Sequence, residues 1–371
     1  MAEPRRILLV NLWLESGGTE RQLTEIAKGL DRSRFEPHVA CLRLQGMRLA
    51  DLREAGVPLA EFPVSGFFRP SHARAWRGFG AYLRQHRIEI VHAFDVPGVL
   101  FGVPAARWYR TPLVLSSQRA FRSLTPDKRP LLRLTDRLAH AIVVNSHAVG
   151  ADLIATDRVP PEKIHYCPNG VDTSRFYPPE ARPSGPPTVG IVAMLRPEKN
   201  IETLLDAFAA SRDAAPGARL VIVGGGECEP VLRRRAAALD LDDVCRFEPP
   251  ARDVPSWLHA FDIFVLPSLS EASSNSLMEA MACGCCVIAS RAGGNPELVE
   301  DEISGLLFEP GDAAGLAQQL RRCLLDAGLR ARLGHAAAQR IRERFSPAAS
   351  VERMSAIYET LFEKIVRSAR T

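Results

Sequence analysis

Short apolar runs alternate with helix-length amphipathic segments along the first 170 residues. The apolar runs occupy residues 7–10, 37–42, 88–91, 113–115 and 141–144. Between the first two runs, residues 19–30 carry Leu23, Ile26, Ala27 and Leu30 at helical spacing. Strands that alternate with helices predict a parallel sheet with helices on both of its faces.

A proline-rich segment divides the chain. Residues 177–187 hold five prolines, which neither a strand nor a helix interior tolerates. Beyond them the alternation resumes, with predicted strands at 189–193, 220–223, 263–267 and 287–289, predicted helices at 201–210, 229–239 and 275–282, and a final amphipathic helix over 347–366. We predict domains at 1–170 and 188–345, a linker at 171–187, and a C-terminal helix (346–371) that packs back on the first domain.

The predicted fold class is therefore α/β, with two doubly wound, Rossmann-like domains that face a cleft. Such sheets bind their ligands outside the carboxyl ends of the strands, so we expect the functional residues there. The chain has no apolar run of membrane-spanning length and no signal-like N-terminus, so we expect a cytoplasmic protein. Residues 1–170 carry 24 Lys and Arg against 16 Asp and Glu, whereas residues 171–371 carry 23 against 27. This asymmetry favours an anionic membrane surface or a phosphorylated substrate, and no nucleic-acid-reading module accompanies it.

Glycines and charged residues follow the predicted strands. Gly17 and Gly18 end the loop after the first strand, and Thr19 has capping-box spacing to Gln22, so a polar or anionic ligand is one interpretation and a plain turn the other. In the second half, Arg196 and Lys199 suit a diphosphate, although a solvated charged turn would look the same. No G-x-G-x-x-G sequence follows the first strand, which argues against a nicotinamide dehydrogenase.

Two carboxylates stand eight residues apart. Glu271 lies on a loop and Glu279 on the helix that follows, with Ser273 or Ser274 as the helix cap. Carboxylates accept hydrogen bonds from vicinal hydroxyls, so the pair could hold two sugars. The D-x-D sequence at residues 240–242 is interpreted as a solvated turn, and no metal site is predicted.

Together, these motifs resemble the retaining GT-B glycosyltransferases of family four (glycosyltransferase group 1). The resemblance rests on Arg196 and Lys199, the glycines at 224–226, the E-x7-E element from Glu271 to Glu279, and residues 293–297. It implies metal-independent transfer of a sugar, with retention, from a UDP- or GDP-type nucleotide sugar and with no further cofactor. Arg196 and Lys199 would neutralise the diphosphate, Glu271 would bind the donor sugar and Glu279 the ribose. The other implied donor-binding residues are Gly17, Gly18, Gly225, Ser274, Asn275, Gly293 and Gly294.

The acceptor side departs from the family pattern, because Gln118 stands where many members have a His. Gln118 cannot act as a base, so Arg119, His92 and Asp95 are further candidates for contacting the acceptor, and His92 is as well explained as a structural residue. Residues 66–87 mix aromatic and arginine side chains, a pattern of helices at anionic lipid, but Trp76, Phe79 and Leu83 share one face, as a core stripe would.

We therefore expect a hexosyltransferase that acts on a glycan or lipid-linked acceptor in bacterial surface-glycan or glycolipid assembly. One alternative is a non-catalytic module that binds nucleotide sugars. The other is a retaining glycosidase, which would need its two carboxyl groups about 5–5.5 Å apart.

Overall fold

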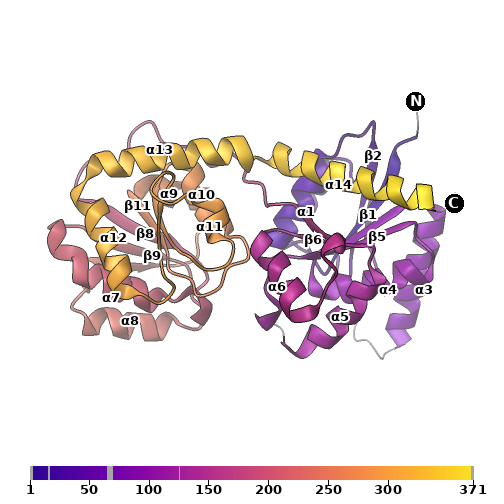
Figure 1. Ribbon diagram of the computed structural model, residues 1–371, viewed down its shortest axis with the longest axis horizontal. Coiled ribbons are helices and arrows are strands. Elements are labelled where there is room, and N and C mark those ends of the chain that lie inside the picture. Colours follow the sequence, from indigo (N-terminus) through magenta and orange to yellow (C-terminus); the bar gives the residue numbers. More distant parts are fainter. Residues whose placement is uncertain (1–2, 16, 65–69, 125, 369–371) are drawn as a thin grey trace. The chain divides into compact units, whose positions relative to one another are not determined.

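The computed structural model describes residues 3–15, 17–64, 70–124 and 126–368, and the chain divides into two units (Figure 1). One unit combines Met1–Gly170 with Pro347–Thr371, and the other comprises Val171–Ser346. None of the described helices combines the length and hydrophobicity that crossing a membrane requires.

The first unit contains a seven-stranded parallel sheet with the strand order β3-β2-β1-β4-β5-β6-β7. Its strands are β1 (Arg5–Asn11), β2 (Phe35–Cys41), β3 (Leu59–Glu61), β4 (Ile90–Ala93), β5 (Leu113–Gln118), β6 (Ala141–Val144) and β7 (Ile164–Tyr166). Its helices are α1 (Gly18–Gly29), α2 (Leu49–Glu54), α3 (Pro70–Gln85), α4 (Val96–Trp108), α5 (Arg129–Leu138), α6 (His147–Asp157) and α14 (Pro347–Ser368), with 3-10 turns η1 (Arg122–Leu124), η2 (Pro126–Lys128) and η3 (Pro161–Lys163).

The second unit contains a six-stranded parallel sheet with the strand order β10-β9-β8-β11-β12-β13. Its strands are β8 (Thr188–Val192), β9 (Arg219–Val223), β10 (Cys245–Glu248), β11 (Ile263–Leu266), β12 (Cys286–Ser290) and β13 (Leu306–Phe308). Its helices are α7 (Ile201–Ser211), α8 (Glu229–Ala238), α9 (Val254–Ala260), α10 (Asn275–Ala282), α11 (Asn295–Leu298), α12 (Ala313–Leu325) and α13 (Ala327–Arg344), with 3-10 turns η4 (Pro197–Lys199) and η5 (Arg212–Ala214).

Alternate residues of the central strands face two separate cores, which is why these strands read as continuous apolar runs. In β1, Ile7 and Leu9 belong to one core, whereas Leu8 and Val10 belong to the core on the opposite face. Each sheet is therefore buried on both faces, and the predicted α/β fold with two Rossmann-like parallel sheets is confirmed.

The strand order reverses once in each sheet, and this position determines where ligands can bind. In the first sheet the reversal falls between β1 and β4, and in the second between β8 and β11. The loops that leave two such strands go to opposite faces of the sheet and leave a crevice between them. Functional residues are therefore expected in the loops after β1, β4, β8 and β11.

The segment predicted as a linker belongs to the second unit. Val171 donates a backbone hydrogen bond to Phe345, Phe176 is buried, and the Arg182 guanidinium donates to the carbonyls of Leu258 and Cys283 at 3.0 and 2.8 Å. This proline-rich stretch is thus a packed strap and not a free connection. Its prolines restrict the backbone, and the contacts of Arg182 hold it to the second unit.

Helix α14, drawn in yellow, packs on the first unit (Figure 1). Met354 and Tyr358 are fully buried in the same core as Ile7 and Leu9. Cation–aromatic and ionic contacts hold the helix from outside, with Arg5 over the Phe362 ring at 3.8 Å and Arg34 paired with Glu359 at 2.7 Å.

The aromatic stripe of α3 is part of the core. Phe79 is fully buried, Leu83 nearly so, and Trp76 packs beside them against Phe101. Residues 66–69, at the start of the segment 66–87 for which both a lipid-facing and a core interpretation were open, lie outside the described residues. In the described part of α3, the arginine side chains are therefore exposed to solvent, and the aromatic rings pack toward the core.

Candidate functional site

The loop after β8 carries both predicted diphosphate-binding cations. β8 ends at Val192, and the turn η4 brings the chain to Lys199 and then to Asn200. Asn200 adopts a left-handed backbone conformation (φ 50°), and its side-chain amide donates to Thr203 Oγ1 at 2.7 Å, so α7 can start immediately. Arg196 is exposed, and no described side chain pairs with it.

Lys199 contacts the first residue of the E-x7-E element. Its Nζ donates to Oε1 of Glu271, and the Ser268 hydroxyl donates to the same oxygen at 2.9 Å. Ser268 lies just after β11 and is fully buried, while 9% of Glu271 is exposed. The two loops that flank the strand-order reversal thus place a cation and a carboxylate side by side.

Backbone and side-chain hydrogen bonds hold these loops to their neighbours. Leu269 N–H donates to the Glu198 carbonyl at 2.8 Å, and Ser290 Oγ, at the end of β12, donates to the Ser268 carbonyl at 2.5 Å. Buried Asn295 donates to the Ser290 carbonyl at 3.0 Å. The Lys199 and Glu271 side chains therefore project from a rigid base, which is what a binding site with fixed geometry needs.

The glycine loop after β9 packs directly on the loop that leads to Arg196. A side chain at Gly224 (φ 146°) would place its Cβ only 1.9 Å from the Ala193 carbonyl oxygen. The Gly225 carbonyl accepts from Leu195 N–H at 3.0 Å. Gly225 therefore supports the cationic loop through its backbone in this structure.

Helix α10 begins where the sequence predicts, with Ser274 as its cap. Ser274 Oγ accepts from Leu277 N–H at 3.3 Å, Asn275 is the first helical residue, and Glu279 lies on the second turn with 6% of its surface exposed. Glu271 lies on the loop before the helix, so the two carboxylates come from different structural elements, as expected.

The turn at Gly293 and Gly294, which the resemblance implies as donor-binding, uses one of its backbone donors within the protein. Gly293 has φ 51°, and Gly294 N–H donates to the Glu271 carbonyl at 2.9 Å. The Gly294 amide is therefore already engaged, and it holds the loop that presents Glu271.

In the first unit, α1 starts without the predicted capping box. Gly17 is the cap position, no side chain caps the helix, and Thr19 lies inside its first turn. The Gln22 amide instead donates to the Gly170 carbonyl at 2.8 Å and accepts from the Gly170 N–H at 2.9 Å. Gln22 thus joins α1 to the loop after β7, and no side chain caps the start of α1.

Asp95 and His92 have structural roles in this unit. Asp95 caps α4, accepting from Gly98 N–H at 2.8 Å and from Leu12 N–H at 2.9 Å, and burial raises its pKa to about 6. His92 is fully buried between Tyr358 Oη (2.8 Å) and Ser117 Oγ (2.9 Å), and burial holds its pKa well below the usual value. The geometry supports the structural interpretation of His92.

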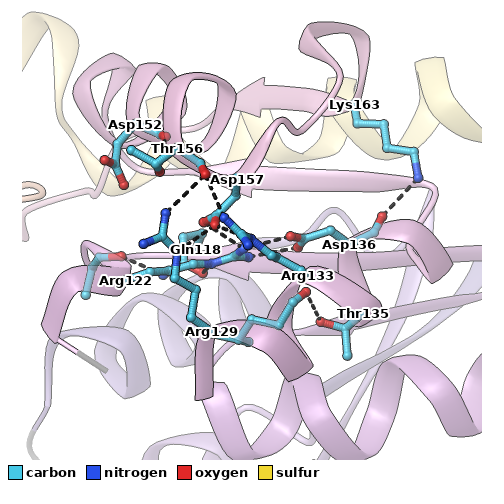
Figure 2. Close-up of polar contacts among 12 residues, drawn as sticks. Gln118, Arg122, Arg129, Arg133, Thr135, Asp136, Asp152, Thr156, Asp157 and Lys163 are labelled. Carbon is cyan, nitrogen blue, oxygen red and sulfur yellow. Dashed lines mark hydrogen bonds and ion pairs between the residues drawn. The ribbon is translucent and has the colours of Figure 1, made fainter. Parts of the chain in front are cut away.

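Gln118 is anchored by a buried ionic network (Figure 2). Its amide donates to the Ala120 carbonyl at 2.5 Å and accepts from Arg122 Nε at 3.1 Å. Arg122, 2% exposed, makes two parallel bonds to Asp136 at 2.7 and 2.8 Å and reaches Asp157 at 3.1 Å. Both ends of the Gln118 side chain are therefore used to fix the loop after β5, and neither is left for acid–base work.

Sequence reasoning assigned no individual role to Ser268 or Arg122, and it included Asn295 only within the segment 293–297. Ser268 has a usable signal, since it follows a strand at the ligand-binding edge. Arg122 has none, because its partners Asp136 and Asp157 are 14 and 35 residues away.

Two family models together match most of the chain. The model "Glycosyl transferases group 1" matches residues 173–340, and "Glycosyltransferase Family 4" matches residues 16–175. The crystal structure of Anabaena Alr3699/HepE in complex with UDP has a TM-score of 0.81, covers 96% of this chain and 100% of that one, and is 22% identical in sequence. The architecture is thus the GT-B fold. The chain belongs to the group 1 glycosyltransferases.

Curated relatives share about a third of their residues with this chain over the aligned region, and they are longer than that region. The D-inositol 3-phosphate glycosyltransferase of Saccharomonospora viridis is 30% identical over 281 residues, which are 70% of this chain and 65% of the relative. The putative colanic acid biosynthesis glycosyltransferase WcaL of Escherichia coli is 32% identical over 215 residues, 56% of this chain and 52% of the relative. The chain thus spans between about half and 65% of the length of these two relatives.

Proposed function

We propose that this protein transfers a sugar, with retention, from a nucleotide diphosphate sugar to a glycan or lipid-linked acceptor in bacterial surface-glycan or glycolipid assembly. The observation that carries the proposal is the pairing of Lys199 with Glu271 where the strand order of the second sheet reverses. Lys199 and exposed Arg196 supply positive charge for a departing diphosphate, so we propose that no metal and no further cofactor is needed. Glu271 would accept from donor-sugar hydroxyls and Glu279 from the ribose.

The acceptor chemistry follows from the engaged state of Gln118 and His92. With no free base among them, we propose that the departing phosphate takes the acceptor proton on the same face of the sugar. The bond between the acceptor oxygen and the anomeric carbon forms, the bond from that carbon to the phosphate oxygen breaks, and the proton ends on the nucleoside diphosphate. The carboxylate of Glu271 already accepts from an ammonium group and a hydroxyl, which suits sugar binding better than the leaving-group protonation of a glycosidase.

A UDP-type donor and a cytoplasmic site at the inner face of the membrane complete the proposal. Solved relatives include Alr3699/HepE in complex with UDP and with UDP-glucose. The positive balance of residues 1–170 is compatible with an anionic membrane surface. The predicted cleft between the two domains stays a prediction.

A thermal-shift panel with UDP, GDP, ADP and their glucose conjugates, in EDTA, tests the donor. A ligand that binds only the folded protein raises its melting temperature, so we expect one diphosphate to give a selective rise. No shift with any of them would contradict the proposal. Retention is tested by NMR of the product: an α-configured donor must give an α-linked sugar, and a β linkage would overturn this part.

A further inference from the structure

Arg119 is a half-buried cation with no anionic partner. Its Nη1 donates to Oδ1 of Asn169 at 2.7 Å, and its guanidinium lies 5.3 Å from the centre of the Phe94 ring. Its Nε is buried and makes no hydrogen bond. Among the described residues, no carboxylate forms an ion pair with Arg119.

Two other arginines of the same unit, Arg122 and Arg34, are compensated by carboxylates. Arg122 pairs with Asp136 and Asp157, and Arg34 pairs with Glu359 at 2.7 Å. Arg119 instead loses part of its hydration and contacts only the neutral amide of Asn169 and the face of the Phe94 ring. Burial lowers its pKa. Leaving a guanidinium in such a place is costly unless an anion comes to it.

The position of Arg119 is the ligand-binding edge of the first sheet. It follows β5 directly, its partner Asn169 lies in the loop after β7, and the next residue, Gly170, is bonded in both directions to Gln22 of α1. The carboxyl ends of β5 and β7 and the first half of α1 are thus joined at one place. The N-terminal end of a helix adds positive potential for an anion nearby.

The loop that carries Arg119 is braced. Gln118 and Ala120, its two chain neighbours, are hydrogen-bonded to each other, and the Gln118 oxygen is fixed by Arg122, which Asp136 and Asp157 hold in turn (Figure 2). Arg119 is therefore presented on a rigid segment. Rigid presentation lowers the entropic cost of binding a ligand.

We propose that Arg119 binds a phosphate group of the acceptor. This inference rests on the proposed transferase function and narrows its substrate class to phosphate-bearing acceptors. A guanidinium donates strong, charge-assisted hydrogen bonds to phosphate oxygens, and no described residue accepts a hydrogen bond from Nη2 of Arg119. The phosphate can belong to a soluble phosphorylated polyol or to a phosphate-linked lipid.

Calorimetric titration of the full chain separates these sources. The probes are myo-inositol 3-phosphate with myo-inositol as its control, geranyl phosphate with geraniol as its control, and UDP. We expect at least one phosphate probe to bind and its phosphate-free control not to bind. Arg119→Gln should lower the affinity for that probe by about tenfold or more, as loss of a charge-assisted hydrogen bond implies. Whether the inositol or the geranyl compound binds tells which source applies.

Three variants make the result specific. Arg53→Gln removes the same charge from an exposed position on α2 of the same unit and should leave binding unchanged. Lys199→Ala should bind the phosphate probe with native affinity and bind UDP more weakly, whereas Arg119→Gln should bind UDP with native affinity. If Arg119→Gln does not fold by circular dichroism, Arg119→Lys decides, with a loss of about threefold or more expected because Lys lacks the planar fork.

Binding of every phosphate probe to Arg119→Gln as tightly as to the native chain would overturn the inference, as would no binding of any of them to the native chain. Failure of UDP to bind the native chain would instead count against the proposed donor. The phosphate-probe titrations would still test the role of Arg119.

Discussion

The ammonium group of Lys199 and the carboxylate of Glu271 share a hydrogen bond although 72 residues separate them in the chain. The contact exists because β8 and β11 are neighbours in the sheet and the loops after them are held together by Leu269 and Glu198. Each partner fixes the side chain of the other. A donor would meet one preorganised pair with its diphosphate on the lysine side and its sugar on the carboxylate side.

Replacing Lys199 by Ala should lower turnover strongly, because the charge that develops on the departing diphosphate would lose its nearest cation. Loss of one such electrostatic contact costs about a hundredfold or more in kcat. Initial rates of UDP release at saturating donor measure the effect. Arg53→Gln is the matched control for charge removal away from this sheet, and an unchanged rate in Lys199→Ala would remove the lysine from the mechanism.

Coupling between the pair gives a second readout. In a cycle of Lys199→Met, Glu271→Gln and the double variant, we expect a non-additive effect on UDP-sugar affinity, because each single change leaves the other charge without its partner. Free energies that add within about 0.5 kcal/mol would show that the two side chains act independently.

Glu279→Gln should weaken uridine and UDP alike, whereas Lys199→Ala should weaken UDP and spare uridine. The reason is that the proposed partner of Glu279 is the ribose, which both ligands carry, while only UDP carries phosphates. We expect a loss of about tenfold in each affected affinity, the cost of a hydrogen bond to a charged group. Uridine affinity is measured by calorimetry, and a Glu279→Gln variant that binds uridine normally would contradict the ribose role.

The central strands and the site loops could be predicted from the sequence because local pattern determines both. The run Ile263–Leu266 is buried on both faces and reads as apolar throughout, and Glu271, Ser274 and Glu279 follow it at fixed offsets. The edge strands β3, β7, β10 and β13 were not predicted. β3, β7 and β13 have only three residues each, which is too short for a periodic signal. The residues of β3 and β7 are also half-exposed or exposed, and β10 carries two charged residues among its four, so hydrophobicity does not mark these three strands either.

Contacts between distant residues could not be predicted, and they decide what the acceptor-side residues do. His92 is an ordinary strand-end histidine in the sequence, but Tyr358 reaches it from α14, 266 residues away. Asp95 similarly caps α4 and receives Leu12 N–H from the loop after β1. Periodicity shows which side chains are buried, whereas their hydrogen-bond partners depend on how the elements pack.

Arg122→Met should destabilise the first unit, because Asp136 and Asp157 would lose a buried cation. Breaking a buried ion pair from one side costs about 3–5 kcal/mol, although Arg129 and Arg133 continue to compensate Asp157. Hydrogen exchange of peptides from α5 and α6 measures this unit by itself. Arg129→Met, which removes a more exposed partner of the same Asp157, should cost much less, and equal costs would show that burial of Arg122 is unimportant.

The stability of the first unit should fall as the pH drops below about 6.5, in part through His92. Burial holds the pKa of folded His92 well below that of the unfolded chain, so only the unfolded state takes up the proton. The contribution of His92 is therefore complete above the unfolded pKa and is lost toward lower pH, at about 1.4 kcal/mol per pH unit. His38, His140 and His165 have lowered pKa values as well, and the raised pKa of Asp95 acts in the opposite direction, so the difference between the native chain and a variant is the quantity to measure.

His92→Gln isolates this contribution. Hydrogen exchange of β4 and β5 peptides from pH 8 to pH 5, corrected for the intrinsic exchange rate, should show a shallower loss of protection in His92→Gln than in the native chain. His335→Gln, an exposed position on α13, should leave the pH profile unchanged. If His92→Gln kept the native slope, His92 would bind protons equally well in the folded and unfolded states, and the lowering of its pKa by burial would be contradicted.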